Sequence, residues 1–239
     1  MVIAVWGRDG IGKSGLCDEL GKLFAKMGVT VIVDTDLTQP TLPVRLNGAK
    51  IDSNASLGKA IGMGTSDAAI YLHQHPKQKT LFYAGLTDQD EYMSYELGLE
   101  ADSAAQDFVE RCTELADIVI LDMSGQRSDP FLPAALIHAE KVITLFTPNV
   151  QGICWLNSIK PLIDTMNAQE RILPVAAMAG RHHDMATVEK AMDSKLAAAL
   201  PFVWEYQQDG ISNGATRAAM RYCQEVNKLQ VMLKGADTI

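Results

Sequence analysis

The chain has 239 residues, 47% of them hydrophobic and 21% charged, with a formal net charge of -8. This length and composition predict a folded domain with a large apolar core and exclude a chain that is disordered throughout. The net negative charge argues against permanent electrostatic binding to DNA or to anionic lipid. No run of about 18 apolar residues occurs, so we expect no transmembrane helix.

The first half of the chain alternates short apolar runs with longer amphipathic segments. Residues 2–6 form an apolar run that we interpret as a buried strand rather than as part of a signal peptide. A helix is predicted over 13–27, where apolar side chains recur on one face before Gly28, and an apolar strand over 29–33. Two short helices and a further strand complete this half, at 56–61, 65–71 and 79–84.

The second half repeats the alternation. Helices and strands are predicted in turn at 103–115, 117–122, 129–139, 141–146, 150–166, 172–177, 185–200, 201–204 and 214–234. Near-continuous apolar strands separated by helices are typical of parallel sheets covered on both faces. We therefore predict a single α/β domain over 1–239, with a mostly parallel, doubly wound sheet and helices on both faces. Such sheets bind ligands beyond the carboxyl ends of their strands.

A glycine-rich loop follows the first predicted strand. Residues 7–14 match G-x-x-x-x-G-K-[ST] in full. Because the loop leaves a strand and opens a helix, its backbone N–H groups and the helix N-terminus can bind phosphate. Lys13 would reach the β- and γ-phosphates, and Ser14 would ligate Mg²⁺ through its hydroxyl. The predicted nucleotide contacts are Gly7, Arg8, Asp9, Gly10, Ile11, Gly12, Lys13, Ser14 and Gly15.

Three carboxylates stand near the ends of predicted strands. Asp122 ends an apolar strand, where a buried carboxylate is costly unless a cation such as Mg²⁺ lies near it. Asp34 and Asp36 follow the strand 29–33 and, in an extended chain, point to the same side. Two carboxylates this close repel each other unless a cation or a donor lies between them. A helix cap at Asp122 and a solvated turn at Asp34 and Asp36 are the alternative interpretations.

These stretches together resemble the MinD/ParA family of P-loop ATPases, whose loop reads G-K-G-G-x-G-K-[ST]. The resemblance runs from residue 1 to about residue 165, and includes the loop, Asp34-Thr-Asp36, the strand that ends at Asp122 with Ser124-Gly125 after it, and Pro148. It implies a P-loop NTPase fold, ATP and Mg²⁺ as cofactors, and a homodimer in the ATP state.

The resemblance also implies roles for single residues. Asp36 would orient or activate the attacking water, and Asp34 would support Mg²⁺ or the loop. Ser14, Asp34 and Asp122 are thus the predicted metal ligands. Asp36, Arg8 and Lys13 are the predicted catalytic residues.

Two loop positions depart from the family. Arg8 stands where the family has its signature lysine, and Asp9 stands where it has glycine. Arg8 has three interpretations: a finger that reaches a partner's nucleotide and speeds hydrolysis, a nucleotide contact without efficient hydrolysis, or a structural pair with Asp9. The charge of Asp9 near the phosphates should weaken ATP binding or slow turnover. We therefore expect at most a slow ATPase.

The C-terminal third contains fewer motifs. The family often has an asparagine after the strand that reads Val175 to Arg181 here, and none stands there, so we assign no residue to base recognition. Arg181 either stacks on a base or lies at the surface, and His182-His183-Asp184 is interpreted as a polar loop. The helix predicted over 214–234 has an apolar stripe and basic residues, which fit either a docking helix or an interfacial membrane helix. The tail over 234–239 has an acid and few bulky residues, which favours docking.

The expected role is a nucleotide-switched positioning protein. Within the family the chain looks most like the TadZ/CpaE-like pilus-assembly localisation branch, because of its altered loop, the segment 86–90 and the missing asparagine. Membership of this branch would imply a protein partner in a pilus or secretion machine. A DNA-partitioning ATPase is the alternative, although the sequence carries no strong nucleic-acid signal. A nucleotide-binding scaffold without efficient hydrolysis is another.

Four scattered cysteines carry no metal-ligand spacing. They are Cys17, Cys112, Cys154 and Cys223. With no CxxC motif, a metallochaperone or related metabolic enzyme is disfavoured. Reduced, structural thiols and a cytoplasmic location are expected.

Overall fold

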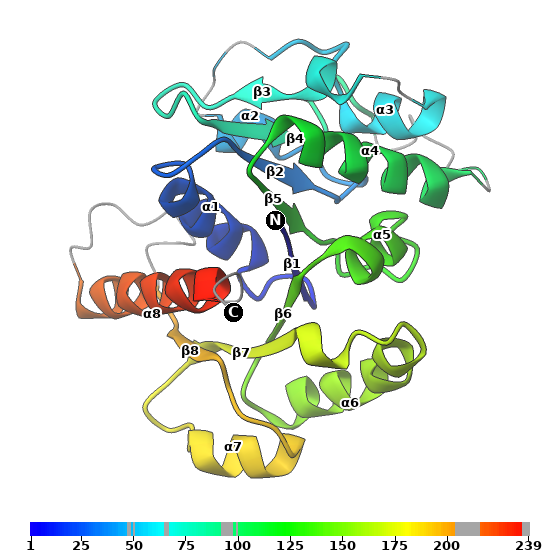
Figure 1. The fold of residues 1–239 in the computed structure, drawn as a ribbon. Helices are drawn as coiled ribbons and strands as arrows, with labels where there is room; N and C mark the ends of the chain where they lie inside the picture. Colours follow the sequence, from blue (N-terminus) through cyan, green and yellow to red (C-terminus); the bar gives the residue numbers. More distant parts are fainter. Residues whose placement is uncertain are drawn as a thin grey trace.

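The computed structural model describes residues 1–46, 49, 51–64, 67–91, 98, 100–203 and 216–235. Within these residues the chain forms one eight-stranded sheet in the order β3-β4-β2-β5-β1-β6-β7-β8 (Figure 1). The pairings are parallel except that of β3 with β4. The strands are β1 (Val2–Gly7), β2 (Thr30–Asp34), β3 (His73–Gln74), β4 (Leu81–Ala84), β5 (Ile118–Asp122), β6 (Lys141–Phe146), β7 (Ile172–Ala179) and β8 (Ala198–Pro201).

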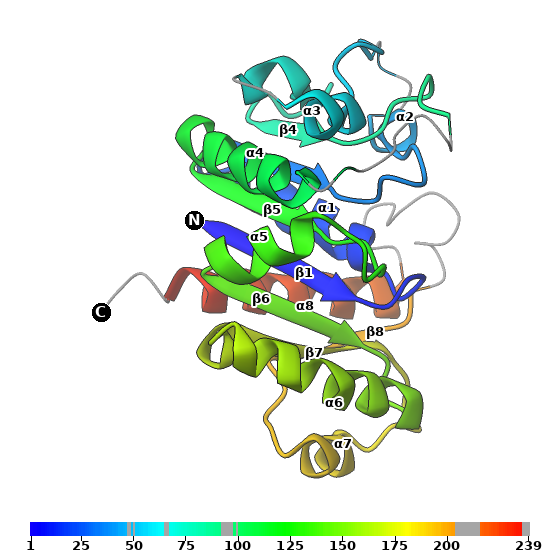
Figure 2. The same cartoon turned by 90° about the vertical axis from the view of Figure 1, so that its right-hand side faces the viewer.

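Helices cover both faces of the sheet (Figures 1 and 2). One apolar cluster holds α1 (Lys13–Phe24), α2 (Leu42–Arg45) and α8 (Arg217–Lys234). The opposite cluster holds α3 (Leu57–Met63), the 3₁₀ turn η1 (Ala68–Tyr71), α4 (Ala101–Leu115), α5 (Phe131–His138), α6 (Val150–Thr165) and α7 (Met185–Met192). A further 3₁₀ turn, η2 (Gln169–Arg171), leads into β7.

The central strand β1 shows why both faces must be covered. Its side chains alternate between the two clusters: Val2, Ala4 and Trp6 enter one, and Ile3 and Val5 the other. All six residues of β1 are buried. Successive side chains on a strand point to opposite faces, so a fully apolar strand is stable only between two helical layers. The predicted fold class is confirmed.

Some predicted boundaries were wrong. The helix expected over 185–200 ends at Met192, because Asp193 adopts a left-handed conformation with φ 52°. The chain then turns back, Ala197 N donates to Pro174 O, and β8 begins at Ala198 instead of residue 201. β3, which lies between the expected elements 65–71 and 79–84, pairs with β4 as a short hairpin. Parts of the expected elements 65–71, 201–204 and 214–234 lie outside the described residues.

α8 buries an apolar stripe against the rest of the domain. Ala219, Tyr222, Val226, Leu229 and Leu233 belong to the cluster that also contains the buried face of α1. These side chains are thus packed inside the domain, whereas Met220, Val231 and Met232 of the same helix are exposed. In the described part of the chain, no helix combines the length and apolar character needed to cross a bilayer.

The parallel pairing brings the predicted site residues to one edge. β1 lies between β5 and β6, and β2 lies on the other side of β5. Asp34 and Asp122 are register partners at the ends of β2 and β5. The loop after Gly7 therefore emerges beside both carboxylates, at the carboxyl ends of the strands, where such sheets bind ligands.

Candidate functional site

The geometry of the loop after β1 explains its glycines. A Cβ on Gly7 would lie 2.4 Å from the carbonyl oxygen of Leu145 on β6, so no larger residue fits without a shift. Gly10 and Gly12 have φ of 75° and 93°, in the region that side chains disfavour. Gly12 then forms the N-cap of α1, so the loop ends at a helix N-terminus with exposed N–H donors.

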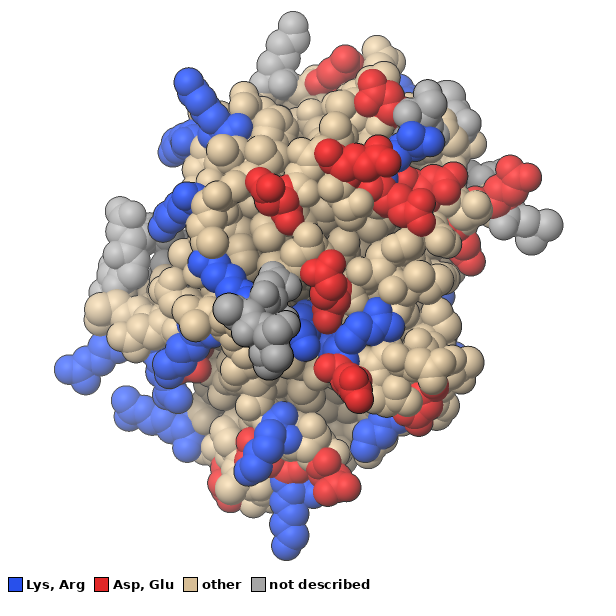
Figure 3. Space-filling model, in the orientation of Figure 1, with Lys and Arg blue, Asp and Glu red and all other residues tan. Residues whose placement is uncertain are grey.

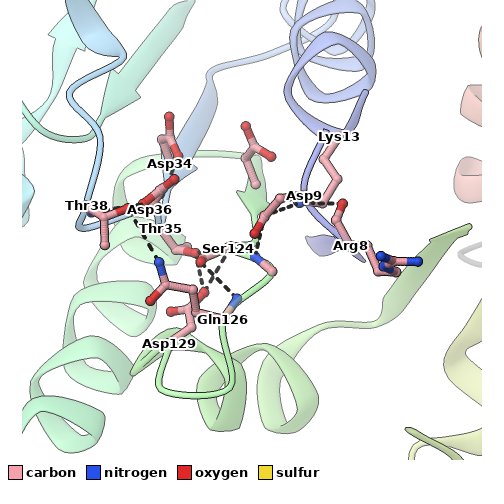
Figure 4. A network of polar contacts seen from close by, with 12 residues as sticks. Arg8, Asp9, Lys13, Asp34, Thr35, Asp36, Thr38, Ser124, Gln126 and Asp129 are labelled. Carbon is pink, nitrogen blue, oxygen red and sulfur yellow. Dashed lines mark hydrogen bonds and ion pairs between the residues drawn. The ribbon is translucent and has the colours of Figure 1, made fainter. Parts of the chain in front are cut away.

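Lys13 folds back over this loop. Its Nζ donates to the carbonyl oxygen of Arg8 at 3.0 Å and to Oδ1 of Asp9 at 3.0 Å. The Arg8 side chain is exposed and points away from this pair (Figure 4). Asp9 thus pairs with Lys13, and the alternative of a structural Arg8–Asp9 pair is not what the structure contains. Ser14 lies exposed on the first turn of α1.

A buried arginine bridges the two carboxylates at the strand ends. Arg45, at the end of α2, contacts Oδ2 of Asp122 through Nη2, and its Nε lies 3.6 Å from Oδ2 of Asp34. Its Nη1 lies 3.4 Å from Oδ1 of Asp18 on α1. The Arg45 side chain is 5% exposed, and its guanidinium carbon lies 5.9 Å from the ring centre of Tyr83.

Burial sets the electrostatics of this cluster. Burial raises the pKa of Asp18 and of Asp34, and the nearby Arg45 charge opposes both shifts. Although burial disfavours the Arg45 charge, the three carboxylates together raise its pKa. Thr41 Oγ1 and Asp36 N also donate to Asp34. The guanidinium is therefore the permanent countercharge of this cluster.

The same carboxylates are the predicted Mg²⁺ ligands. A hydroxyl from Ser14 and carboxylates from Asp34 and Asp122 match the oxygen donors that Mg²⁺ prefers. For Mg²⁺ to contact both carboxylates, however, Arg45 would have to move. No cluster of three or more His, Cys, Asp or Glu side chains arranged for a metal occurs among the described residues. Mg²⁺ ligation remains a prediction.

Sequence reasoning missed Arg45. The only signal was a single basic residue at the end of the run Leu-Pro-Val-Arg, which gives no direction for the side chain. An arginine after an apolar turn is usually solvated. Its role follows from the place of α2 beside the ends of β2 and β5.

A second polar network surrounds Asp36 and Asp129 (Figure 4). Asp36 Oδ1 accepts from the Thr38 backbone N–H at 2.9 Å and from its hydroxyl at 2.5 Å. Asp129 Oδ2 accepts from Thr35 Oγ1 at 2.5 Å and Ser124 N at 3.0 Å.

Asp129 was also missed by sequence reasoning. Burial raises its pKa to about 7, although its hydrogen bonds, including one from Phe131 N at 2.8 Å, act in the opposite direction. These bonds join the loop after β2 to the loop after β5. Asp129 thus holds two loops of the site together.

A cavity of about 550 Å³ adjoins the loop after β1. One wall is apolar and comes from the ends of β7 and β8. This wall includes Ala177, Met178, Leu200, Pro201, Phe202 and Val203. Met178 has φ 55°, an unfavourable conformation for a bulky side chain, at an irregularity in the β7–β8 pairing. Arg181 is exposed and does not line the cavity. Sequence patterns reveal neither the strain at Met178 nor the position of this wall, so the wall residues were not predicted.

Comparison with known proteins links the chain to one fold. No family model matches it, and no curated protein matches it in sequence. Among solved structures, a plasmid partition protein from Borrelia burgdorferi bound to AMPPNP has a TM-score of 0.78 at 15% identity, covering 98% of each chain. The septum site-determining protein MinD from Pyrococcus horikoshii, complexed with Mg-ADP, has a TM-score of 0.76 at 15% identity, covering 100% of this chain and 99% of that one.

A third similar structure is the MinC:MinD cell division complex from Aquifex aeolicus. Its TM-score is 0.75 at 13% identity, and the match covers 100% of this chain and 97% of that one. At this level of identity the likeness establishes the fold alone, which the chain shares with these MinD and partition-protein structures.

Proposed function

We propose that the chain binds ATP with Mg²⁺ and hydrolyses it slowly, as a nucleotide-dependent switch. The observation that carries the proposal is the complete phosphate-loop motif between β1 and α1, with Lys13 folded over it beside the carboxyl ends of β2 and β5. Fold alone does not specify function. Here, however, the loop, the lysine and the cavity lie together.

Each part of the site has a physical task. The loop amides, the N-terminus of α1 and Lys13 bind the phosphates. The adjoining cavity receives the ribose and base, and its apolar wall supplies contact area instead of base-specific hydrogen bonds. Bound Mg²⁺ would neutralise phosphate charge, with Ser14, Asp34 and Asp122 as its holders. Asp36 orients the attacking water.

Two charged residues support slow turnover. Asp9 places a carboxylate next to Lys13, where phosphate charge must enter. Arg45 forms ion pairs with Asp34 and Asp122, the carboxylates that would also ligate Mg²⁺. ATP and Mg²⁺ must therefore displace internal ion pairs before chemistry. We expect turnover far below the enzyme median of about 10 s⁻¹.

A Lys13→Ala variant tests nucleotide binding. We expect calorimetry to show a loss of at least about tenfold in affinity for a non-hydrolysable ATP analogue, because a buried cation at the phosphates is removed. Lys26→Ala, which removes an exposed lysine just beyond the other end of α1, is the matched control. Equal affinity of Lys13→Ala and the unmodified chain for the ATP analogue would contradict the proposal.

The switch would act through a homodimer. Among the described residues the Arg8 guanidinium has no ion-pair partner, so it is free to reach the nucleotide of a second copy. We expect ATP analogue to double the mass measured by light scattering, and Arg8→Ala to abolish this shift while nucleotide still binds. If the mass of the unmodified chain stays constant at saturating nucleotide, Arg8 does not act on the nucleotide of a second copy.

The cellular task is proposed as positioning of a pilus or secretion machine through a protein partner, in the cytoplasm. DNA partition is the second candidate, and likeness to both MinD and a partition protein favours neither. The net charge of -8 weighs against DNA. On the face in Figure 3 acidic side chains gather mainly at the upper right and basic ones mainly along the left and lower edges, where they stand apart instead of forming a continuous basic surface.

A further inference from the structure

The Asp9 carboxylate joins two loops that come from different strands. Its Oδ1 accepts from Lys13 Nζ at 3.0 Å and from the backbone N–H of Gly125 at 3.0 Å (Figure 4). Lys13 is the first residue of α1, directly after the loop that holds Asp9, and Gly125 follows β5. One anionic oxygen therefore holds an ammonium group and an amide from two sides of the candidate phosphate site.

These are donors that a terminal phosphate would need. The lysine of a phosphate loop reaches the β- and γ-phosphates, and the loops of such switches are ordered by contacts with the terminal phosphate. A carboxylate oxygen and a phosphate oxygen are both charged acceptors for the same N–H groups. Asp9 thus accepts hydrogen bonds from the two donors, Lys13 Nζ and Gly125 N, that would otherwise bind the third phosphate.

Gly125 fits this contact. A Cβ built on Gly125 would lie 2.4 Å from Oδ1 of Asp9 and 2.6 Å from its carboxyl carbon. Any side chain at this position would push the carboxylate out. The absence of a side chain at residue 125 and the carboxylate at residue 9 are therefore complementary, although 116 residues separate them.

We infer that the Asp9 carboxylate stands in for the terminal phosphate, so that this site takes a nucleoside diphosphate in preference to a triphosphate. The inference rests on the proposed nucleotide site and specifies its ligand. A diphosphate leaves the Asp9 contacts in place. A triphosphate must displace Asp9 from Lys13 and Gly125 or meet its negative charge at close range.

The test is calorimetric titration of ADP and AMPPNP at one fixed Mg²⁺ concentration. We expect the unmodified chain to bind ADP at least about tenfold more tightly than AMPPNP. In Asp9→Asn, which keeps the shape and removes the charge, this ratio should fall about tenfold. Glu114→Gln removes one exposed carboxylate at the opposite edge of the sheet and serves as the matched control, with an unchanged ratio.

Gly125→Ala gives a second route to the same result. Its methyl group expels the carboxylate while Asp9, Lys13 and the amide at residue 125 all remain, so the ratio should again shift toward AMPPNP. An unmodified chain that prefers AMPPNP, or a ratio unchanged in both variants, would overturn the inference alone. Failure of both nucleotides to bind the unmodified chain would overturn the proposed function with it.

Discussion

An Arg45→Met variant should have a free energy of unfolding about 3–5 kcal/mol lower at pH 7, because it leaves buried carboxylates without their countercharge. Arg45 is the basic group that contacts Asp18, Asp34 and Asp122 together. Methionine fills a similar length but supplies no charge and no N–H donor. The carboxylates must then be protonated or hydrated in the native state, and either change costs free energy.

The pH dependence of this loss has a definite sign. Without Arg45, the native-state pKa values of Asp18 and Asp34, already raised by burial, rise further above those of the unfolded chain. The native variant then holds protons that the unfolded chain releases, so its stability falls as pH rises. The deficit relative to the unmodified chain should be largest above pH 7 and should shrink toward pH 4.

Urea unfolding followed by circular dichroism measures this effect. Arg45→Lys keeps the charge but cannot bridge three carboxylates in a planar fork, so it should recover only part of the stability. Arg8→Met, at an exposed arginine, should change stability by less than about 0.5 kcal/mol. Mg²⁺ should stabilise Arg45→Met, since the carboxylates then become available as ligands. A loss under about 1 kcal/mol for Arg45→Met, constant with pH, would refute the countercharge role.

Asp129 should make the unmodified chain less stable as the pH rises from 5 to 7. Burial raises its native pKa to about 7, well above the ordinary value of about 3.9 in the unfolded chain. Over this range the unfolded chain has released the proton and the native state still binds it. The contribution to stability is therefore complete below about pH 4 and is lost as pH rises through 7.

The variant Asp129→Asn isolates the pH-dependent contribution of Asp129 to the free energy of unfolding. Asparagine keeps only one of the two oxygens that accept from Ser124 N and Phe131 N, a loss that is the same at every pH, and it cannot ionise. The free energy of unfolding of the variant relative to the unmodified chain should therefore rise by about 2 kcal/mol between pH 5 and pH 7. Urea titrations at pH 5, 6, 7 and 8 give this difference. Asp107→Asn, at an exposed carboxylate on α4, controls for the loss of one charge. A difference that stays constant over this range would contradict the buried, neutral carboxyl.

Features that depend on neighbouring residues along the chain could be predicted from the residues alone. Apolar runs such as residues 2–6 predict buried strands, because period and length act within a few residues. The spacing of Gly7, Gly12 and Lys13 predicts the loop, since the backbone conformations it needs are set by those residues. The alternation of strands and helices then predicts the parallel sheet and the edge where Asp34 and Asp122 meet.

The pairing of charges across the site, by contrast, could be identified only from the three-dimensional fold. Arg45 and Asp122 are 77 residues apart, and Asp9 and Gly125 are 116 apart, so no local pattern joins them. Their contacts depend on the placement of β5 between β1 and β2, which brings three loops to one edge. In water these side chains would be solvated separately. Burial makes Arg45 and Asp122 require partners, which the fold supplies from within the chain, whereas the exposed Asp9 meets Gly125 because their loops adjoin.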